Sequence, residues 1–108
     1  MIDQKNIVTI NNYPGKEIAD VLGYVKGSVV QSKHVGRDFM AGLKTIVGGE
    51  LKGYTEMLEE ARQIATERML KEADSLGADA VIGFKIQTSA VTQGASEIIA
   101  YGTAVTFK

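Results

Sequence analysis

The sequence predicts a single α+β domain, in which a mainly antiparallel sheet packs against two helices. Apolar residues change along the chain from a period of two to a period of 3.6 and back again. The predicted order is β-β-α-α-β-β, and such grouping of strands and helices, without strict alternation, is typical of α+β domains. The chain has 108 residues, 44% of them hydrophobic and 23% charged. This is the length and composition of one globular domain spanning residues 1–108.

Two strands are predicted in the first third of the chain. Ile7–Ile10 is a short β-prone run that precedes a cluster of turn-forming residues. The second strand is predicted over about Val21–Gln31, where Val21, Val25 and Val29 lie on one side of a period-two pattern. Gly23 and Gly27 interrupt this pattern and indicate a bend or bulge. Its beginning, Ile18–Leu22, also fits a helical turn, so the two alternatives remain open there.

The first predicted helix is Asp38–Val47. Its apolar residues return on one side at helical spacing. Asp38 can cap the N-terminus and Gly48 can end the helix, because glycine readily adopts the left-handed conformation found there.

The second helix, Thr55–Leu76, has the clearest pattern in the sequence. Thr55 can cap its start, and Gly77 is placed to end it. One stripe of apolar and small residues follows the helical repeat: Leu58, Ala61, Ala65, Met69, Ala73 and Leu76. The small alanines predict a close approach of this helix to a sheet or to another helix.

Two further strands are predicted at the C-terminus, joined at Gln93-Gly94. The first is Ala80–Thr88, whose alternation places Ile82, Phe84 and Ile86 on one face. Ser96–Phe107 then returns as a long strand. The residues on both of its faces are apolar or small, which argues against a solvated side.

Charge and composition exclude several classes of function. The chain carries 12 basic and 13 acidic residues, so no overall positive field would draw it to nucleic acid or to an anionic membrane. It has no cysteine, which removes disulfides, thiolate nucleophiles and cysteine-based metal sites. The N-terminus lacks the apolar run of a signal peptide, and no segment approaches the roughly 20 apolar residues of a membrane span. We therefore expect a cytoplasmic protein without membrane or nucleic-acid partners.

An ordered series of short motifs resembles the YbjQ-like family of small bacterial proteins. The similarity extends from about Ile7 to Phe107, and it depends on the order and spacing of the motifs rather than on any one of them. The motifs are Gly15-Lys16-Glu17-Ile18, Gly23-x-Val25-x-Gly27, Arg37-Asp38, Ile46-Val47-Gly48-Gly49 with Tyr54, Glu60-Ala61-Arg62, Gly77–Gly83 and Gly102-Thr103-Ala104-Val105.

The resemblance implies an α+β subunit that assembles with copies of itself into a ring, a homopentamer. The family is labelled putative heavy-metal-binding, but the resemblance implies no established activity. We therefore expect a non-enzymatic binding or scaffold protein whose ligand the sequence does not identify. Heavy-metal binding is the alternative, and an enzyme is a third interpretation.

Metal ligands of the kind that heavy metals prefer are scarce in this chain. Soft or borderline metals bind cysteine, histidine or clustered methionine. The chain has His34 as its one histidine, and its methionines are scattered and fit helix cores. A ring could bring several copies of His34 together. No cofactor is predicted, and a bound divalent metal stays a secondary possibility.

The segment Gly48–Thr55 (GGELKGYT) nearly matches a phosphate-binding P-loop. Gly48, Gly53 and Thr55 have the required spacing, but Tyr54 replaces the lysine that would contact the phosphates. A P-loop also follows a strand, whereas a helix is predicted here. We interpret the segment as a connector between two helices, with Tyr54 anchoring the corner.

The candidate binding residues are His34, Arg37, Asp38, Glu50 and Tyr54. Arg37 and Asp38 could form an ion pair within a subunit or across an interface, although a helix cap beside a solvated arginine explains them equally well. Asp38, Glu50 and Glu97 do not fall on an evidently solvated helix face, so all three could take part in acid–base chemistry. No catalytic residue is assigned, because nucleophilic catalysis would have only His34 as its base.

Overall fold

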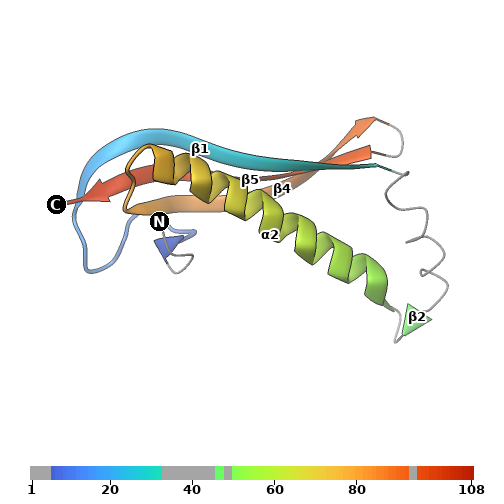
Figure 1. Cartoon of the computed structure of the whole chain (residues 1–108). Coiled ribbons are helices and arrows are strands. Elements are labelled where there is room, and N and C mark those ends of the chain that lie inside the picture. Colours follow the sequence, from blue (N-terminus) through green and yellow to red (C-terminus); the bar gives the residue numbers. More distant parts are fainter. Residues whose placement is uncertain (1–5, 33–45, 48–49, 93–94) are drawn as a thin grey trace.

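The computed structural model describes residues 6–32, 46–47, 50–92 and 95–108 of the chain, and these residues form two layers. One helix lies across one face of an antiparallel sheet, as Figure 1 shows. The strand order in this sheet is β1-β5-β4. The elements are β1 (Ile18–Ser32), β2 (Ile46–Val47), β3 (Glu50–Leu51), α2 (Lys52–Ser75), β4 (Ala80–Thr92) and β5 (Ala95–Phe107). The α+β class is confirmed.

The long helix packs on the sheet through small residues, as its sequence predicts. Ala61, Ala65, Met69 and Ala73 are fully buried and belong to one core cluster with residues of all three strands. The end of the predicted stripe is wrong, because Leu76 lies beyond the helix and is 46% exposed. The predicted start is also wrong: α2 begins at Lys52, so Thr55 belongs to the first turn of the helix instead of capping it.

The C-terminus of α2 ends at a glycine in the left-handed conformation. Gly77 has φ 77°. Its N–H donates to the carbonyl oxygen of Asp74, and the N–H of Ala78 donates to that of Ala73. This pair of bonds is the Schellman arrangement, and Ala73 and Ala78 also share the core cluster. The predicted stop at Gly77 is confirmed.

The first strand is longer than predicted and is extended throughout, which excludes a helical turn at Ile18–Leu22. Its pairing with β5 shifts between Val21 and Gly23, where Gly23 has φ 125° and permits the bulge. Gly27 has a different role. A Cβ atom at this position would collide with backbone atoms of Ala65 and Met69, so Gly27 lets α2 approach the sheet closely.

The fourth strand contains a bulge that the sequence pattern did not predict. Pairing with β5 shifts between Ile82 and Lys85, around Gly83 with φ 62°. The alternation is interrupted there, so Ile82 and Phe84 belong to different core clusters. The prediction that Ile82 shares a face with Phe84 and Ile86 is therefore wrong, because it assumed an uninterrupted period of two.

The last strand alternates as predicted. Ile98, Ala100 and Ala104 are buried under α2. Gly102 continues this face, and a Cβ atom there would come within 2.6 Å of Cγ1 of Val81. Strands β4 and β5 pair as an antiparallel hairpin, from the pair of Ala80 with Val105 to the pair of Thr92 with Ala95. The residues of its turn, 93 and 94, lie outside the described part of the chain.

The N-terminal segment runs beside β4 without forming the predicted strand over Ile7–Ile10. Only an isolated bridge joins Ile7 to Val81. The N–H of Val8 donates to the carbonyl oxygen of Val81, and the N–H groups of Phe84 and Gly83 donate to the carbonyl oxygens of Val8 and Ile10. The bulge at Gly83 explains why no regular ladder forms, because it disrupts the edge to which this segment binds.

The first predicted helix, Asp38–Val47, is contradicted at its end. Ile46 and Val47 form β2, which pairs with Leu51 and Glu50 of β3. Residues 38–45 lie outside the description. Both residues of β2 are β-branched, which favours a strand.

The face of the sheet opposite α2 is only partly covered. At one end, Tyr13 and Phe107 pack with their ring centroids 4.9 Å apart, beside the small cluster of Ala80, Ile82 and Val105. Along the rest of β1, large side chains are exposed: Val21 by 66%, Tyr24 by 58% and Val30 by 59%. We call this surface, with Lys26, Lys85, Ile99 and Tyr101, the open sheet face.

Candidate functional site

A groove of 340 Å³ lies between α2 and β4. Phe84 and Ile86 on the helix-side face of β4 are only half-buried, so α2 leaves this part of the strand partly uncovered. The groove is lined by Ile7, Glu59, Arg62, Gln63, Thr66, Phe84 and Ile86. Its floor is therefore apolar and its helical wall is polar, which is the usual composition of a ligand groove.

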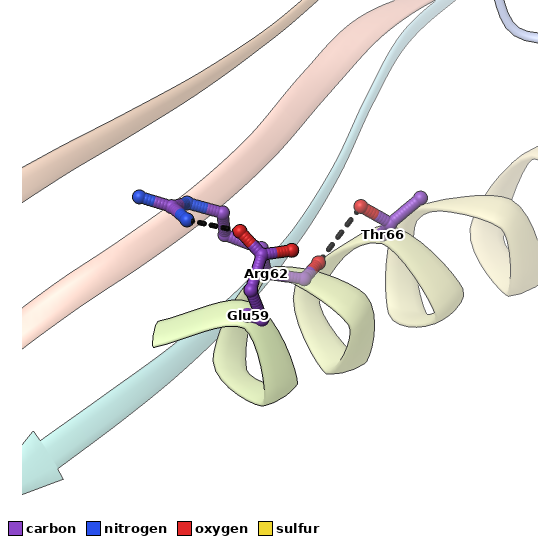
Figure 2. Close-up of polar contacts among 3 residues, drawn as sticks. All are labelled: Glu59, Arg62 and Thr66. Carbon is purple, nitrogen blue, oxygen red and sulfur yellow. Dashed lines mark hydrogen bonds and ion pairs between the residues drawn. The ribbon is translucent and has the colours of Figure 1, made fainter. Parts of the chain in front are cut away.

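The polar side chains of this wall bind one another along α2. Nη1 of Arg62 is 2.6 Å from Oε1 of Glu59, and both side chains are partly exposed (Figure 2). The hydroxyl of Thr66 donates to the carbonyl oxygen of Arg62 at 2.8 Å. Gln63 donates from Nε2 to Oε1 of Glu67. The groove therefore offers an ion pair at its rim, and the lining shows no nucleophile beside a base.

The open sheet face has a different chemistry. Lys26 and Lys85 flank Tyr101 in register across the three strands. Tyr24 packs against Tyr101 with ring centroids 6.3 Å apart. This face therefore combines exposed aromatic and apolar surface with two lysines, a composition common at protein interfaces.

The structure does not bring the sequence-predicted site residues into one site. His34, Arg37 and Asp38 lie outside the described residues. Glu50 is in β3, paired with Val47, and Tyr54 is in the first turn of α2. Nothing is described of the side chains of these two residues, so the binding role of all five stays a prediction.

The P-loop interpretation changes in one detail. Two short strands, β2 and β3, precede α2, where a helix was predicted. A phosphate site would still need a lysine where the chain has Tyr54. The described residues of the segment form β3 and the first turn of α2, so the prediction of a connector between two helices is wrong for them.

Sequence reasoning missed the groove residues. The sequence pattern gives Glu59 no role, and Arg62 appears only within the Glu60-Ala61-Arg62 motif. The spacing of Glu59 and Arg62 by three residues could have predicted their ion pair. The groove itself depends on how far the helix extends over β4, and a helical pattern does not contain that information.

The described residues do not fit a soft-metal site. No group of three or more histidine, aspartate or glutamate side chains lies close enough together in this part of the chain to hold a metal ion. The sequence has no cysteine, and its one histidine, His34, lies outside the description. α2 carries too many charged residues to cross a bilayer, and the described part of the chain contains no other helix that could.

Comparison with known proteins identifies the family. The family model described as "Putative heavy-metal-binding", of the YbjQ type, matches residues 6–108. The chain belongs to the YbjQ-like family. This confirms the resemblance found in the sequence.

Curated relatives of this YbjQ-like chain are bacterial proteins of similar length. A "UPF0145 protein" of Vibrio campbellii is 61% identical over 97 residues, which cover 90% of this chain and 93% of the relative. One from Thermotoga maritima is 61% identical over 99 residues, covering 92% and 93%. These names state a family and no activity.

A solved structure supports the fold. The crystal structure of a protein with unknown function from Pediococcus pentosaceus superimposes with a TM-score of 0.65. The match covers 94% of this chain and 96% of that one, at 18% identity. At this identity the comparison shows that the YbjQ-like chain and the Pediococcus pentosaceus protein share a fold, and it gives no information about a ligand.

Proposed function

We propose that this YbjQ-like chain is a non-enzymatic scaffold or binding protein that works as a closed ring of identical copies, with five copies by family resemblance. The observation that carries the proposal is the open sheet face. One layer of helix covers one side of the sheet, and Val21, Tyr24 and Val30 on the other side are more than half exposed. An antiparallel sheet can face water on one side, but large apolar and aromatic side chains exposed together on that side favour contact with a partner surface.

Charge supports the proposal that the covering layer is the helix of the next copy. Within Thr55–Ser75, α2 carries six acidic and three basic residues. The middle of the open sheet face carries Lys26 and Lys85 beside Tyr101. The two lysines outnumber Glu97, which pairs with Val30 on the same face, so the sheet face and the acidic helix are unlike surfaces. Contacts between unlike surfaces repeat head to tail, and they form a closed ring where the rotation between copies closes.

The groove favours a binding role over an enzymatic one. Its ion pair, Arg62 with Glu59, and its hydroxyl, Thr66, are held within α2. An acid–base enzyme would need at least one such group directed at a substrate. The ligand class stays open in this proposal, and the five residues predicted from the sequence remain its candidate contacts.

Light scattering tests the ring. We expect a mass several times the 11.6 kDa of one chain. A double variant, Lys26→Glu with Lys85→Glu, should break the ring and lower the mass to no more than two chains, because two negative charges then face an acidic helix. Asn12→Glu, a negative charge added at an exposed residue before β1, is the matched control and should leave the mass unchanged. A wild-type mass of one chain would refute the proposal.

Heavy-metal binding is the second candidate, supported by the family description alone. It requires copies of His34 to meet in the assembly, because one chain offers one imidazole. Calorimetry with Zn²⁺ and Cu²⁺ should then show saturable heat in the wild type and none in His34→Ala. Absence of heat in the wild type would exclude it.

A further inference from the structure

The outer edge of β4 is covered along only part of its length. β4 is at one side of the sheet, with β5 as its neighbour on the other side. Up to Phe84 the outer edge binds the N-terminal segment through three backbone hydrogen bonds. Beyond Phe84, no backbone hydrogen bond to the outer edge is found among the described residues. Residues 87–92 of this strand are exposed.

The direction of the backbone groups follows from β5. Residues of a central antiparallel strand bond alternately to the two neighbours. Lys108 donates its N–H toward Glu17, before β1, and Val105 accepts from Asp79, before β4. Even-numbered residues of β5 therefore face β1 and odd-numbered residues face β4.

This alternation shows which groups of β4 point outward. A residue of β4 opposite an even-numbered residue of β5 directs its N–H and C=O away from the sheet. Val81, opposite Ala104, fits, since its carbonyl accepts the outside bond from Val8. By the same rule, three further residues direct their N–H and C=O groups outward. They are Ile86 opposite Ala100, Thr88 opposite Ile98 and Ala90 opposite Ser96.

The sequence does not protect this edge. Natural sheets block pairing at an edge with charges, prolines or covering elements. Ile86–Thr92 reads IQTSAVT and contains no charge, proline or glycine. On the opposite side of the sheet, Arg68 reaches from α2 and donates to the outward carbonyl of Ser28 at 2.6 Å. The register shift between Ala90 and Thr92 limits the regular edge to Ile86–Ala90.

We infer that this edge of β4 pairs antiparallel with the same edge of a second copy, around a two-fold axis at Thr88. In that register Thr88 meets the partner's Thr88, and Ile86 meets the partner's Ala90. Every outward N–H and C=O of the segment then has a partner, because the three outward residues are evenly spaced about Thr88. The nearest charge on the strand is Lys85, and the two copies of Lys85 lie about 20 Å apart, so no like charges meet.

The groove supports a strand at this place. Its apolar floor includes Ile86 and Phe84, which are both only partly buried. A strand added beside β4 would lie along the open side of this floor and remove part of it from water. The small side chain of the partner's Ala90 opposite Ile86 leaves room for this. The contact is independent of the proposed ring, because it uses an edge of the sheet and not its face.

A single cysteine tests the register directly, since the chain has none of its own. Facing residues in a hydrogen-bonded antiparallel pair have Cα atoms about 5.5 Å apart, which suits a disulfide. After oxidation, Thr88→Cys should appear as a disulfide-linked dimer on a non-reducing gel. Asn12→Cys, at an exposed residue before β1, is the control and should give no disulfide-linked dimer. Equal cross-linking of the two variants, or no cross-linking of either, would overturn the inference. This holds even if a different partner binds this edge.

Charge exchange at the same residue gives a second test that does not depend on oxidation. Thr88→Lys and Thr88→Glu should each halve the mass measured by light scattering, because like charges meet at the axis. Mixing the two variants should restore the larger mass. An unchanged mass in both variants would contradict a two-fold contact at Thr88. The ring is tested separately, because Lys26→Glu with Lys85→Glu should leave the Thr88→Cys disulfide intact.

Discussion

Gly27 of β1 lies against the backbone of α2 at Ala65. A Cβ atom on Gly27 would overlap the carbonyl oxygen of Ala65 and the amide nitrogen of Met69, and it would be 2.7 Å from Cβ of Arg68. The helix can therefore approach the sheet this closely only because residue 27 has no side chain. The contact joins two elements about 40 residues apart and defines the distance between the two layers.

Gly27→Ala should lower the free energy of unfolding by about 3 kcal/mol, since the atoms in the way belong to backbone and cannot change rotamer. Urea unfolding measures the change. Ser28→Ala is the control, because the side chain of Ser28 lies on the face of the sheet opposite α2. A loss of less than about 0.5 kcal/mol in Gly27→Ala would show that the layers are not in such close contact.

Arg68→Met should lower the free energy of unfolding by about 1 kcal/mol, because it leaves the outward carbonyl of Ser28 without its partner. Because this carbonyl is on a sheet edge, we also expect more aggregation on heating. Turbidity during a thermal ramp measures it. Lys71→Met, which removes a similar charge from an exposed helical position, should aggregate no more than the wild type.

Gly77→Ala should lower the free energy of unfolding by about 1 kcal/mol, because the left-handed conformation that ends α2 is unfavourable for alanine. Gly77→Asn should cost less, since asparagine tolerates this conformation better. Thermal unfolding followed by circular dichroism would rank the three proteins. Equal stability of the alanine and asparagine variants would contradict the backbone explanation.

Asp79→Ala should destabilise the chain by about 1–2 kcal/mol. Oδ2 of Asp79 accepts the N–H of Phe107 at 2.8 Å, and its side chain thereby joins the start of β4 to the last residue of β5 at one end of the sheet. Asp79→Asn keeps an acceptor oxygen and should retain most of the stability. Urea unfolding distinguishes the two variants, and an alanine variant as stable as the asparagine variant would exclude this bond as a contributor.

The main helix and the order of the last two strands could be predicted from the sequence because their patterns are long. Ala61, Ala65, Met69 and Ala73 recur at helical spacing, and burial follows directly from that repeat. Short segments were predicted less well. Residues 46 and 47 follow a helical stripe in sequence, yet they pair with β3, and pairing of this kind depends on neighbours that a local pattern does not reveal.

The face of Ile82 and the groove were missed for related reasons. The bulge at Gly83 shifts the alternation of β4 by one residue, and a glycine in a strand does not say whether it bulges or only packs closely. Gly27 and Gly83 illustrate the two cases within one sheet. The groove depends on the position of α2 across the strands, which is a property of the assembled layers.

The alanine-rich contact between helix and sheet has a thermodynamic consequence. Ala61, Ala65, Ala73, Ala100 and Ala104 are fully buried, and such short side chains remove little apolar area from water per residue. In the proposed ring, a subunit with so thin an interior would gain much of its stability from contacts with the other copies. By mass action, its melting temperature should then rise with protein concentration, so that folding and assembly form one coupled equilibrium.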